Sequence, residues 1–301
     1  MDVREGANQM TTVVQPNHTP GPLVQLTAEE FALFRDLIYD KTAICVGDQK
    51  RTLVSNRLRR RLRVLGLKRF REYYDLLADP ALMEEEIPHF LSVVTTNETY
   101  FFRQERFWRL VLERLLDDIA ARRSAAGHKS MRFWSGASSS GEEAYTLSIV
   151  ISEYLKGKPG WDIHILGTDI SQRVLEKARR AEYDAYAVSK MRPEQVKRYF
   201  TQTGDGRVYR LCDSIRNMAD FRFHNLKDPM PDGRFDLVIL RNVMMYFDRP
   251  AKRLILENVT EATVPGGYVF VGEIDPTKDA KDLRDGMNLE YVEPSLYRRS
   301  A

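Results

Sequence analysis

The chain has 301 residues, of which 43% are hydrophobic and 30% charged, a composition typical of folded globular proteins and long enough for two domains. No apolar run approaches the ~18 residues of a membrane span, and the first residues lack the apolar core of a secretory signal. Cys45 and Cys212 are isolated, which argues against a zinc site. We therefore expect a cytoplasmic protein without a metal and without direct membrane insertion.

The net charge of +3 is unevenly distributed along the chain. Ten Lys or Arg and no Asp or Glu lie between Lys50 and Arg71, which leaves −7 for the rest of the protein. Such a segment is either a solvated helix face or a surface for an acidic partner.

The chain changes character at about residue 24. Residues 1–23 are rich in Gly, Pro, Asn, Gln and Thr and show little hydrophobic periodicity, so we expect a mobile tail. Residues 24–92 predict a small all-helical domain, in which Thr27 caps the first helix and Gly66 ends the second. Its four helices are expected at 26–42, 50–67, 69–79 and 82–94.

Residues 93–130 are expected to form a linker and a connecting helix, and strands then alternate with helices through 131–301. This alternation predicts an α/β domain with a mostly parallel sheet. Residues 287–300 lack a crossover helix and predict an antiparallel hairpin, and about 200–221 predicts a small β-rich insertion. The expected strands are 131–137, 161–170, 219–226, 235–242 and 266–275, and the expected helices are 144–155, 171–183 and 253–263.

The segment "GASSSGEEAY" (136–145) has two glycines at the spacing of a phosphate-binding loop. Glu142 and Glu143 stand where that loop needs Lys and Ser or Thr, and they would repel a phosphate. A cationic nucleoside without phosphate, such as S-adenosylmethionine, fits better, with Gly136 and Gly141 allowing the backbone to approach it. The alternative is that the two acids only favour the start of a helix.

Polar residues also follow the other expected strands, where α/β sheets bind ligands. Asp169 ends the second strand and can accept hydrogen bonds from both ribose hydroxyls of a nucleoside. Alternatively it caps the next helix, which Ser171 could also do. Asn225 follows the third strand, and Arg241 and Asn242 follow the fourth.

Five segments in this order resemble the CheR-type chemotaxis receptor methyltransferases. They are "TTNETYFFRQ" (95–104), "FWSGASSSGEEAYTLS" (133–148), "GTDISQRVLEKARRAEY" (167–183), "HNL" (224–226) and "FDLVILRNVMMYFDR" (235–249). The similarity extends into "LIYDKTAI" (37–44) and the basic segment, and covers almost everything from about residue 25 onward.

The resemblance implies a Rossmann-like S-adenosylmethionine-dependent methyltransferase domain with a small β-subdomain insertion, preceded by a small all-α domain. It also implies methylation of glutamate side-chain carboxylates on the cytoplasmic domain of membrane chemoreceptors, with S-adenosylhomocysteine as product, in chemotactic adaptation. Arg103 and Tyr246 match the positions beside the reaction centre. The implied cofactor contacts are Asn97, Thr99, Arg103, Glu143, Asp169, Asn225, Leu226, Arg241 and Asn242. We expect a monomer.

A glutamate carboxylate is ionised at neutral pH, because its reference pKa is ~4.3, so methyl transfer to it needs no catalytic base. His224 is the nearest candidate for a base, and packing at a strand end is the alternative. Arg103 and Tyr246 could orient the carboxylate by hydrogen bonds, or Arg103 could hold the carboxylate of the cofactor. Both roles of Arg103 stay open.

The basic segment could dock acidic receptor helices, the alternative being a solvated face. The expected docking residues are Arg57, Arg59, Arg60, Arg61 and Arg63. The chain departs from the family at Leu240, where Cys is common, and at "GEID" (272–275), where Gly-His-Ser-Glu is common.

Two other functions compete with this interpretation. A nucleic-acid methyltransferase would use the same cofactor, but "RNVMMYF" (241–247) replaces the Asn/Asp-Pro-Pro-Tyr run of many such enzymes, and the basic segment has no aromatic ladder. We therefore expect no nucleic-acid partner. A regulatory module without catalysis is the other alternative, and Arg103, Asn242 and Tyr246 argue against it.

Overall fold

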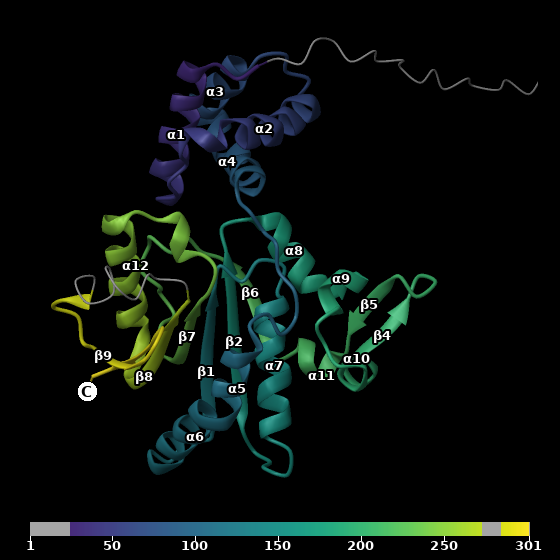
Figure 1. Cartoon of the computed structure of the whole chain (residues 1–301), viewed down its shortest axis with the longest axis vertical. Helices are drawn as coiled ribbons and strands as arrows, with labels where there is room; N and C mark the ends of the chain where they lie inside the picture. Colours follow the sequence, from purple (N-terminus) through teal and green to yellow (C-terminus); the bar gives the residue numbers. More distant parts are fainter. Residues whose placement is uncertain (1–24, 273–283, 301) are drawn as a thin grey trace, which may run out of the picture.

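The computed structural model describes residues 25–272 and 284–300. The expected tail at 1–23 and most of the "GEID" segment lie outside the described residues. Figure 1 shows a helical domain above a central sheet, with a smaller sheet to one side. Within the described part of the chain, no helix is long and apolar enough to cross a membrane.

The four predicted helices of the first domain are confirmed. They are α1 (Ala28–Thr42), α2 (Arg51–Leu65), α3 (Phe70–Ala78) and α4 (Pro80–Val94), with a 3-10 turn at Asp48–Lys50. The Thr27 hydroxyl accepts from Glu30 N at 3.1 Å while the Glu30 carboxylate accepts from Thr27 N, which is a complete capping box. Gly66 ends α2 in the left-handed region, with φ +69°. The core of this domain includes Phe34 and Phe90.

A connecting segment then leads into the sheet. Helix α5 (Glu105–Leu110) passes through a π-helical turn, η2 (Val111–Leu115), into α6 (Leu116–Ala125). Apolar residues of η2 and α6 pack with Met131 and Phe133 of the first strand, so the connection covers one face of the sheet.

The central sheet has seven strands in the order β6-β2-β1-β7-β8-β10-β9. They are β1 (Ser130–Gly136), β2 (Asp162–Asp169), β6 (Ala219–Phe223), β7 (Phe235–Leu240), β8 (Thr263–Val271), β9 (Leu289–Glu293) and β10 (Leu296–Arg299). The five strands up to β8 are parallel, and β10 pairs antiparallel with both β8 and β9, as the predicted hairpin requires. Strand order reverses beside β1, the point where such sheets bind ligands.

Helices cover both faces of this sheet. The helices are α7 (Glu142–Tyr154), α8 (Gln172–Arg180) and α12 (Arg249–Ala262). The apolar side chains of α7 and α8 join the α6 side, and those of α12 pack with Trp134 and Val238 on the other face. Strand β7 is buried along its whole length because both faces are covered.

The small sheet begins earlier than predicted. The expected helix at 171–183 ends at Arg180, and Glu182–Tyr183 instead forms strand β3. This strand pairs antiparallel with β5 (Val208–Leu211), which also pairs with β4 (Phe200–Thr203). Helices α9 (Ala185–Val188), α10 (Pro193–Tyr199) and α11 (Asp213–Arg216) complete this region. A two-residue strand has no periodicity of its own, so only its partner reveals it.

Candidate active site

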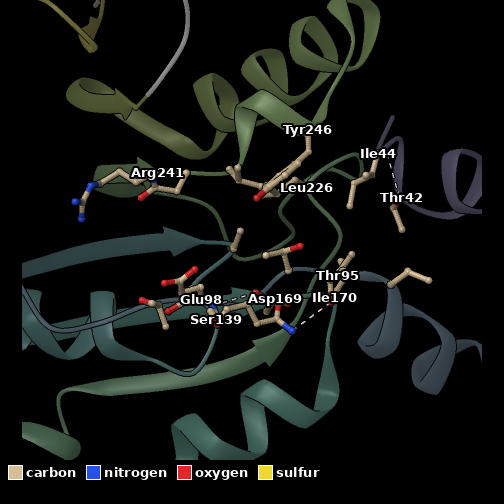
Figure 2. A pocket seen from close by; sticks show the side chains of 18 of the residues that line it. Thr42, Ile44, Thr95, Glu98, Ser139, Asp169, Ile170, Leu226, Arg241 and Tyr246 are labelled. Atoms are coloured by element: carbon tan, nitrogen blue, oxygen red, sulfur yellow. Dashed lines mark hydrogen bonds between the residues drawn. The ribbon is translucent and has the colours of Figure 1, made fainter. Parts of the chain in front are cut away.

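A pocket lies where the helical domain meets the carboxyl ends of the central strands (Figure 2). The space inside it, counted together with the open solvent at its mouth, is about 1270 Å³. All ten residues that the sequence assigned to cofactor or reaction centre line it, namely Asn97, Thr99, Arg103, Glu143, Asp169, Asn225, Leu226, Arg241, Asn242 and Tyr246.

The 136–141 loop turns sharply at one end of the pocket. Ala137, Ser139 and Gly141 all have positive φ, at 55°, 52° and 92°, which coils the backbone tightly. The expected role of the two glycines is wrong in one respect. A Cβ at Gly136 would lie 2.5 Å from a Leu240 methyl, and one at Gly141 would lie 2.9 Å from Ala178. Both glycines therefore allow close packing inside the protein, and neither is among the residues that line the pocket.

Asp169 is held at the pocket wall by the loop backbone. Its carboxylate accepts from Ser139 N at 3.0 Å and from Ser171 N at 2.9 Å. Burial raises the pKa of Asp169, and these backbone donors oppose that rise. The sequence suggested that the Ser171 side chain could cap α8, but it does not. Its hydroxyl instead bonds the Ser92 hydroxyl of the helical domain at 2.9 Å.

Glu143 and Arg241 form a buried ion pair at the inner end of the pocket. Arg241 Nη1 lies 3.0 Å from the Glu143 carboxylate, and the Arg241 side chain is 1% exposed. The guanidinium also donates to Gln104 Oε1 and to the Arg103 carbonyl oxygen, and it lies over the Trp108 ring at 5.2 Å. Burial raises the pKa of Glu143, and Arg241 opposes that rise. Arg241 thus neutralises Glu143 and fixes the backbone beside it.

Glu142 points elsewhere. It is 1% exposed, and its carboxylate accepts from the Ser140 hydroxyl at 2.8 Å, with Lys177 Nζ 3.8 Å away. It is not among the residues that line the pocket. Only one of the two adjacent acids therefore meets the expected ligand.

Arg103 and Tyr246 lie nearer the mouth. Arg103 Nη1 donates to the Glu98 carbonyl oxygen at 3.2 Å, and both flanking residues, Phe102 and Gln104, have φ of 58°. Non-glycine residues with positive φ are uncommon, and Asn242, also at 58°, joins Ala137 and Ser139 as such a residue in the pocket lining. Figure 2 shows Tyr246 beside Leu226 in the pocket.

Two family models match consecutive parts of the chain, from residue 29 to residue 292. The all-alpha domain of CheR methyltransferases matches residues 29–95, and their SAM-binding domain matches residues 97–292. The chain belongs to the CheR methyltransferase family. The predicted family, the α/β fold with its preceding helical domain, and S-adenosylmethionine as cofactor are thereby confirmed.

Curated relatives agree with the CheR assignment. The chain is 34% identical to chemotaxis protein methyltransferase 1 of Pseudomonas aeruginosa, over 90% of this chain and 97% of that protein. It is 37% identical to the chemotaxis protein methyltransferase of Escherichia coli, over 82% of this chain and 84% of that protein.

The CheR pocket is lined by charged groups of both signs. Glu143 and Asp169 line it as carboxylates, while the Arg241 guanidinium is turned toward protein groups. Three other cations, Lys50, Arg57 and Arg103, line the pocket as well. When bound, S-adenosylmethionine supplies an electrophilic methyl group on a positively charged sulfur.

The helical domain contributes a wall that sequence reasoning missed. The segment after α1 is joined to the catalytic domain by an antiparallel bridge between Ile44 and Phe247 and by a 2.8 Å bond from Cys45 N to the Tyr246 carbonyl oxygen. Asn225 Nδ2 donates to the Lys41 carbonyl oxygen at 2.7 Å. The missed lining residues here are Thr42, Ile44, Cys45, Val46, Lys50, Leu53 and Val54. Similarity in 37–44 was the available signal, but it does not show which surface these residues meet.

His224 also lines the CheR pocket, but it has the properties of a packed residue. Its ring lies 5.6 Å from the Trp134 ring, and its Nε2 is buried. Burial lowers the pKa of His224, so the ring is neutral at neutral pH.

The five arginines of helix α2 that we expected to dock the receptor differ in what their side chains contact. Arg61 is wrongly assigned, because it pairs with buried Glu86 at 2.7 Å while Tyr73 donates to the same carboxylate. Arg57 turns inward and donates to Val94 O and to Thr96. Arg59 donates to Asn56 Oδ1. The outward cations are Arg60 and Arg63, both exposed.

Replacing Arg61 by alanine should destabilise the protein by about 3–5 kcal/mol, because Glu86 would remain buried without its counter-charge. Arg60→Ala, on the exposed face of the same helix, should change stability by less than about 0.5 kcal/mol. Urea unfolding monitored by circular dichroism measures both. Equal effects in the two variants would show that the Arg61–Glu86 pair has no special role.

Proposed function

We propose that this CheR-family protein methylates glutamate side-chain carboxylates on the cytoplasmic domain of chemoreceptors, working as a cytoplasmic monomer in chemotactic adaptation. The products are glutamate methyl esters and S-adenosylhomocysteine. The observation that carries the proposal is the lining of one pocket, where Asp169 suits the ribose hydroxyls of the cofactor and Lys50, Arg57 and Arg103 suit an anionic substrate. The relatives named as chemotaxis protein methyltransferases support it.

For the cofactor, we assign the nine lining residues that the family resemblance indicates. Asp169 suits ribose hydroxyls, since it is a carboxylate at the end of β2. Among these nine residues, Arg241 supports the cofactor site indirectly. Its guanidinium holds Glu143 and the Arg103 carbonyl oxygen, so its contribution comes through the residues it orients.

For catalysis, orientation of the substrate carboxylate is the main requirement. The carboxylate is already ionised, so no side chain has to remove a proton. Arg103 and Tyr246 can hold its oxygens in the direction of attack, and positioning of this kind supplies several kcal/mol. The Lys50 ammonium lies 5.4 Å from the centre of the Tyr246 ring, which places a further cation beside the same site.

The chemistry of the product tests the function. The protein is incubated with methyl-labelled S-adenosylmethionine and receptor-containing membranes, and labelled receptor is then treated with mild base. Carboxyl methyl esters release methanol under these conditions, whereas N-methyl groups do not. Label that is absent from receptors, or stable to base, would contradict the proposal.

Charge reversal on α2 tests docking. Arg60→Glu combined with Arg63→Glu should raise the KM for receptor about tenfold at low salt, because an acidic partner would be repelled. The effect should shrink at ~0.5 M salt, since exposed charges are then screened. The matched control is Lys129→Glu with Arg234→Glu, two exposed cations next to the amino ends of β1 and β7. A KM equally insensitive to both pairs would make α2 a solvated face.

A further inference from the structure

We propose that Tyr186, on helix α9 beside the small sheet, positions the guanidinium of catalytic Arg103. This inference rests on the proposed role of Arg103 at the reaction centre. Tyr186 is a positioning residue in this scheme, since it is not among the residues that line the pocket.

The backbone at Arg103 is fixed from two sides. Trp108 Nε1 donates to the Arg103 carbonyl oxygen at 2.9 Å from α5, and Phe101 N donates to the Ala187 carbonyl oxygen at 2.9 Å in α9. The residues on either side of Arg103 both have φ of 58°. Strained residues persist where their surroundings over-determine them, so the catalytic domain and α9 together define this turn.

The Arg103 side chain rests on two residues of the linker. Its Nη1 donates to the Glu98 carbonyl oxygen at 3.2 Å, and its Cζ lies 5.8 Å from the centre of the Tyr100 ring. These contacts are long, so the placement of the guanidinium depends on how firmly Glu98 and Tyr100 are held. Figure 2 shows Glu98 close to Ser139 and Asp169 of the pocket.

Tyr186 contacts both of these supports. Its hydroxyl donates to Glu98 Oε1 at 2.9 Å, and its ring meets the Tyr100 ring edge to face at 6.2 Å. The Tyr186 hydroxyl is protonated at neutral pH because the ordinary pKa of tyrosine is ~10, and the hydrogen bond to Glu98 raises its pKa further. One side chain therefore contacts both residues on which the guanidinium rests, Glu98 through its carboxylate and Tyr100 through its ring.

A role in folding does not explain Tyr186. The side chain is 55% exposed, whereas the contact between α9 and the linker is already made by buried Phe101, whose ring packs on Tyr183 at 4.9 Å and on Phe200 at 5.2 Å. These aromatic contacts join the linker to the small sheet without Tyr186. Figure 1 shows α9 between that sheet and the central one.

The test compares Tyr186→Ala and Tyr186→Phe with the wild type in the receptor methylation assay. Tyr186→Ala should lower kcat about tenfold or more, because small misplacements of a catalytic group are costly. Tyr186→Phe keeps the ring contact and should lose less. The KM for receptor and the Kd for S-adenosylhomocysteine should stay within about twofold of the wild-type values. The unfolding midpoint should be unchanged. The matched control is Tyr291→Ala, which removes a tyrosine of 57% exposure from edge strand β9.

A double variant separates this inference from the proposed function. In an Arg103→Ala background, Tyr186→Ala should have no further effect on kcat, because the group it positions is gone. If Arg103→Ala impairs turnover and Tyr186→Ala does not, or if the two effects add, the inference fails while the function stands. If Arg103→Ala leaves turnover unchanged, both the role of Arg103 and the inference fail.

A readout without turnover completes the test. The NMR signal of the Arg103 Nε–H group can be assigned by its loss in Arg103→Ala. It should shift or sharpen in Tyr186→Ala and stay in place in Tyr291→Ala. An Arg103 signal unaffected by Tyr186→Ala would overturn the inference, even if no receptor were methylated.

Discussion

Replacing Asp169 by alanine is expected to weaken S-adenosylhomocysteine binding by about 100-fold or more. A buried carboxylate that accepts hydrogen bonds from ligand hydroxyls contributes about 1.5–3 kcal/mol per bond, and 1.4 kcal/mol corresponds to a factor of ten. Asp169 is only 7% exposed and lines the pocket, so in the alanine variant water cannot readily take over the hydrogen bonds of the lost carboxylate. Isothermal titration calorimetry measures the change.

The control for Asp169 is Glu142→Gln. Glu142 belongs to the start of α7 and is even more buried than Asp169, but it does not line the pocket. Its replacement should leave S-adenosylhomocysteine affinity within about threefold, if the two acids differ as their positions indicate. An unchanged Kd in Asp169→Ala would remove Asp169 from the cofactor site.

The pH dependence of binding follows from the same carboxylate. Burial raises the pKa of Asp169 above its ordinary value of 3.8, so its proton returns at a higher pH than on an exposed aspartate. Affinity for S-adenosylhomocysteine should therefore be full above this raised pKa and fall as the pH drops through it. Asp169→Asn cannot titrate and should remove this part of the pH dependence.

Replacing Arg241 by alanine is expected to destabilise the protein by about 3–5 kcal/mol, since it leaves Glu143 buried without its ion-pair partner. The same change removes donors from Gln104 Oε1 and from the Arg103 carbonyl oxygen, so turnover should fall with stability. Arg241→Lys should recover little, because an ammonium cannot donate to three separate groups in the plane of a guanidinium. Urea unfolding gives the stability change.

The double variant Arg241→Ala with Glu143→Gln identifies the cause. It should regain part of the lost stability, because the uncompensated charge is gone. In Arg241→Ala alone, Glu143 should bind a proton more readily in the folded state than in the unfolded state. The stability of this variant should therefore rise as the pH falls through that raised pKa toward the ordinary value of 4.5. A loss below about 1 kcal/mol in Arg241→Ala would show that the ion pair is dispensable.

Local chemistry made much of the fold predictable from the sequence. Thr27 with Glu30 sets the start of α1, and Gly66 sets the end of α2, because capping depends on residues within one turn. Alternating strands and helices predicted the central sheet, and the rule that ligands bind beyond strand ends picked out Asp169, Asn225, Arg241 and Asn242, which do line the pocket.

Contacts between distant segments decided the rest. Helical spacing places Arg57 and Arg61 one turn apart, but only the packing of α2 on α4 shows that buried Glu86 neutralises Arg61. Gly136 belongs to a segment that resembles a ligand-binding loop in sequence. In the structure a glycine is needed there because the Leu240 side chain lies against it. The sequence by itself determined the helices and strands, since capping and hydrophobic periodicity are local, and the family resemblance indicated ten of the residues that line the pocket. Tertiary structure alone decided which charges are free and which are paired, because pairing depends on the residue that the fold brings opposite.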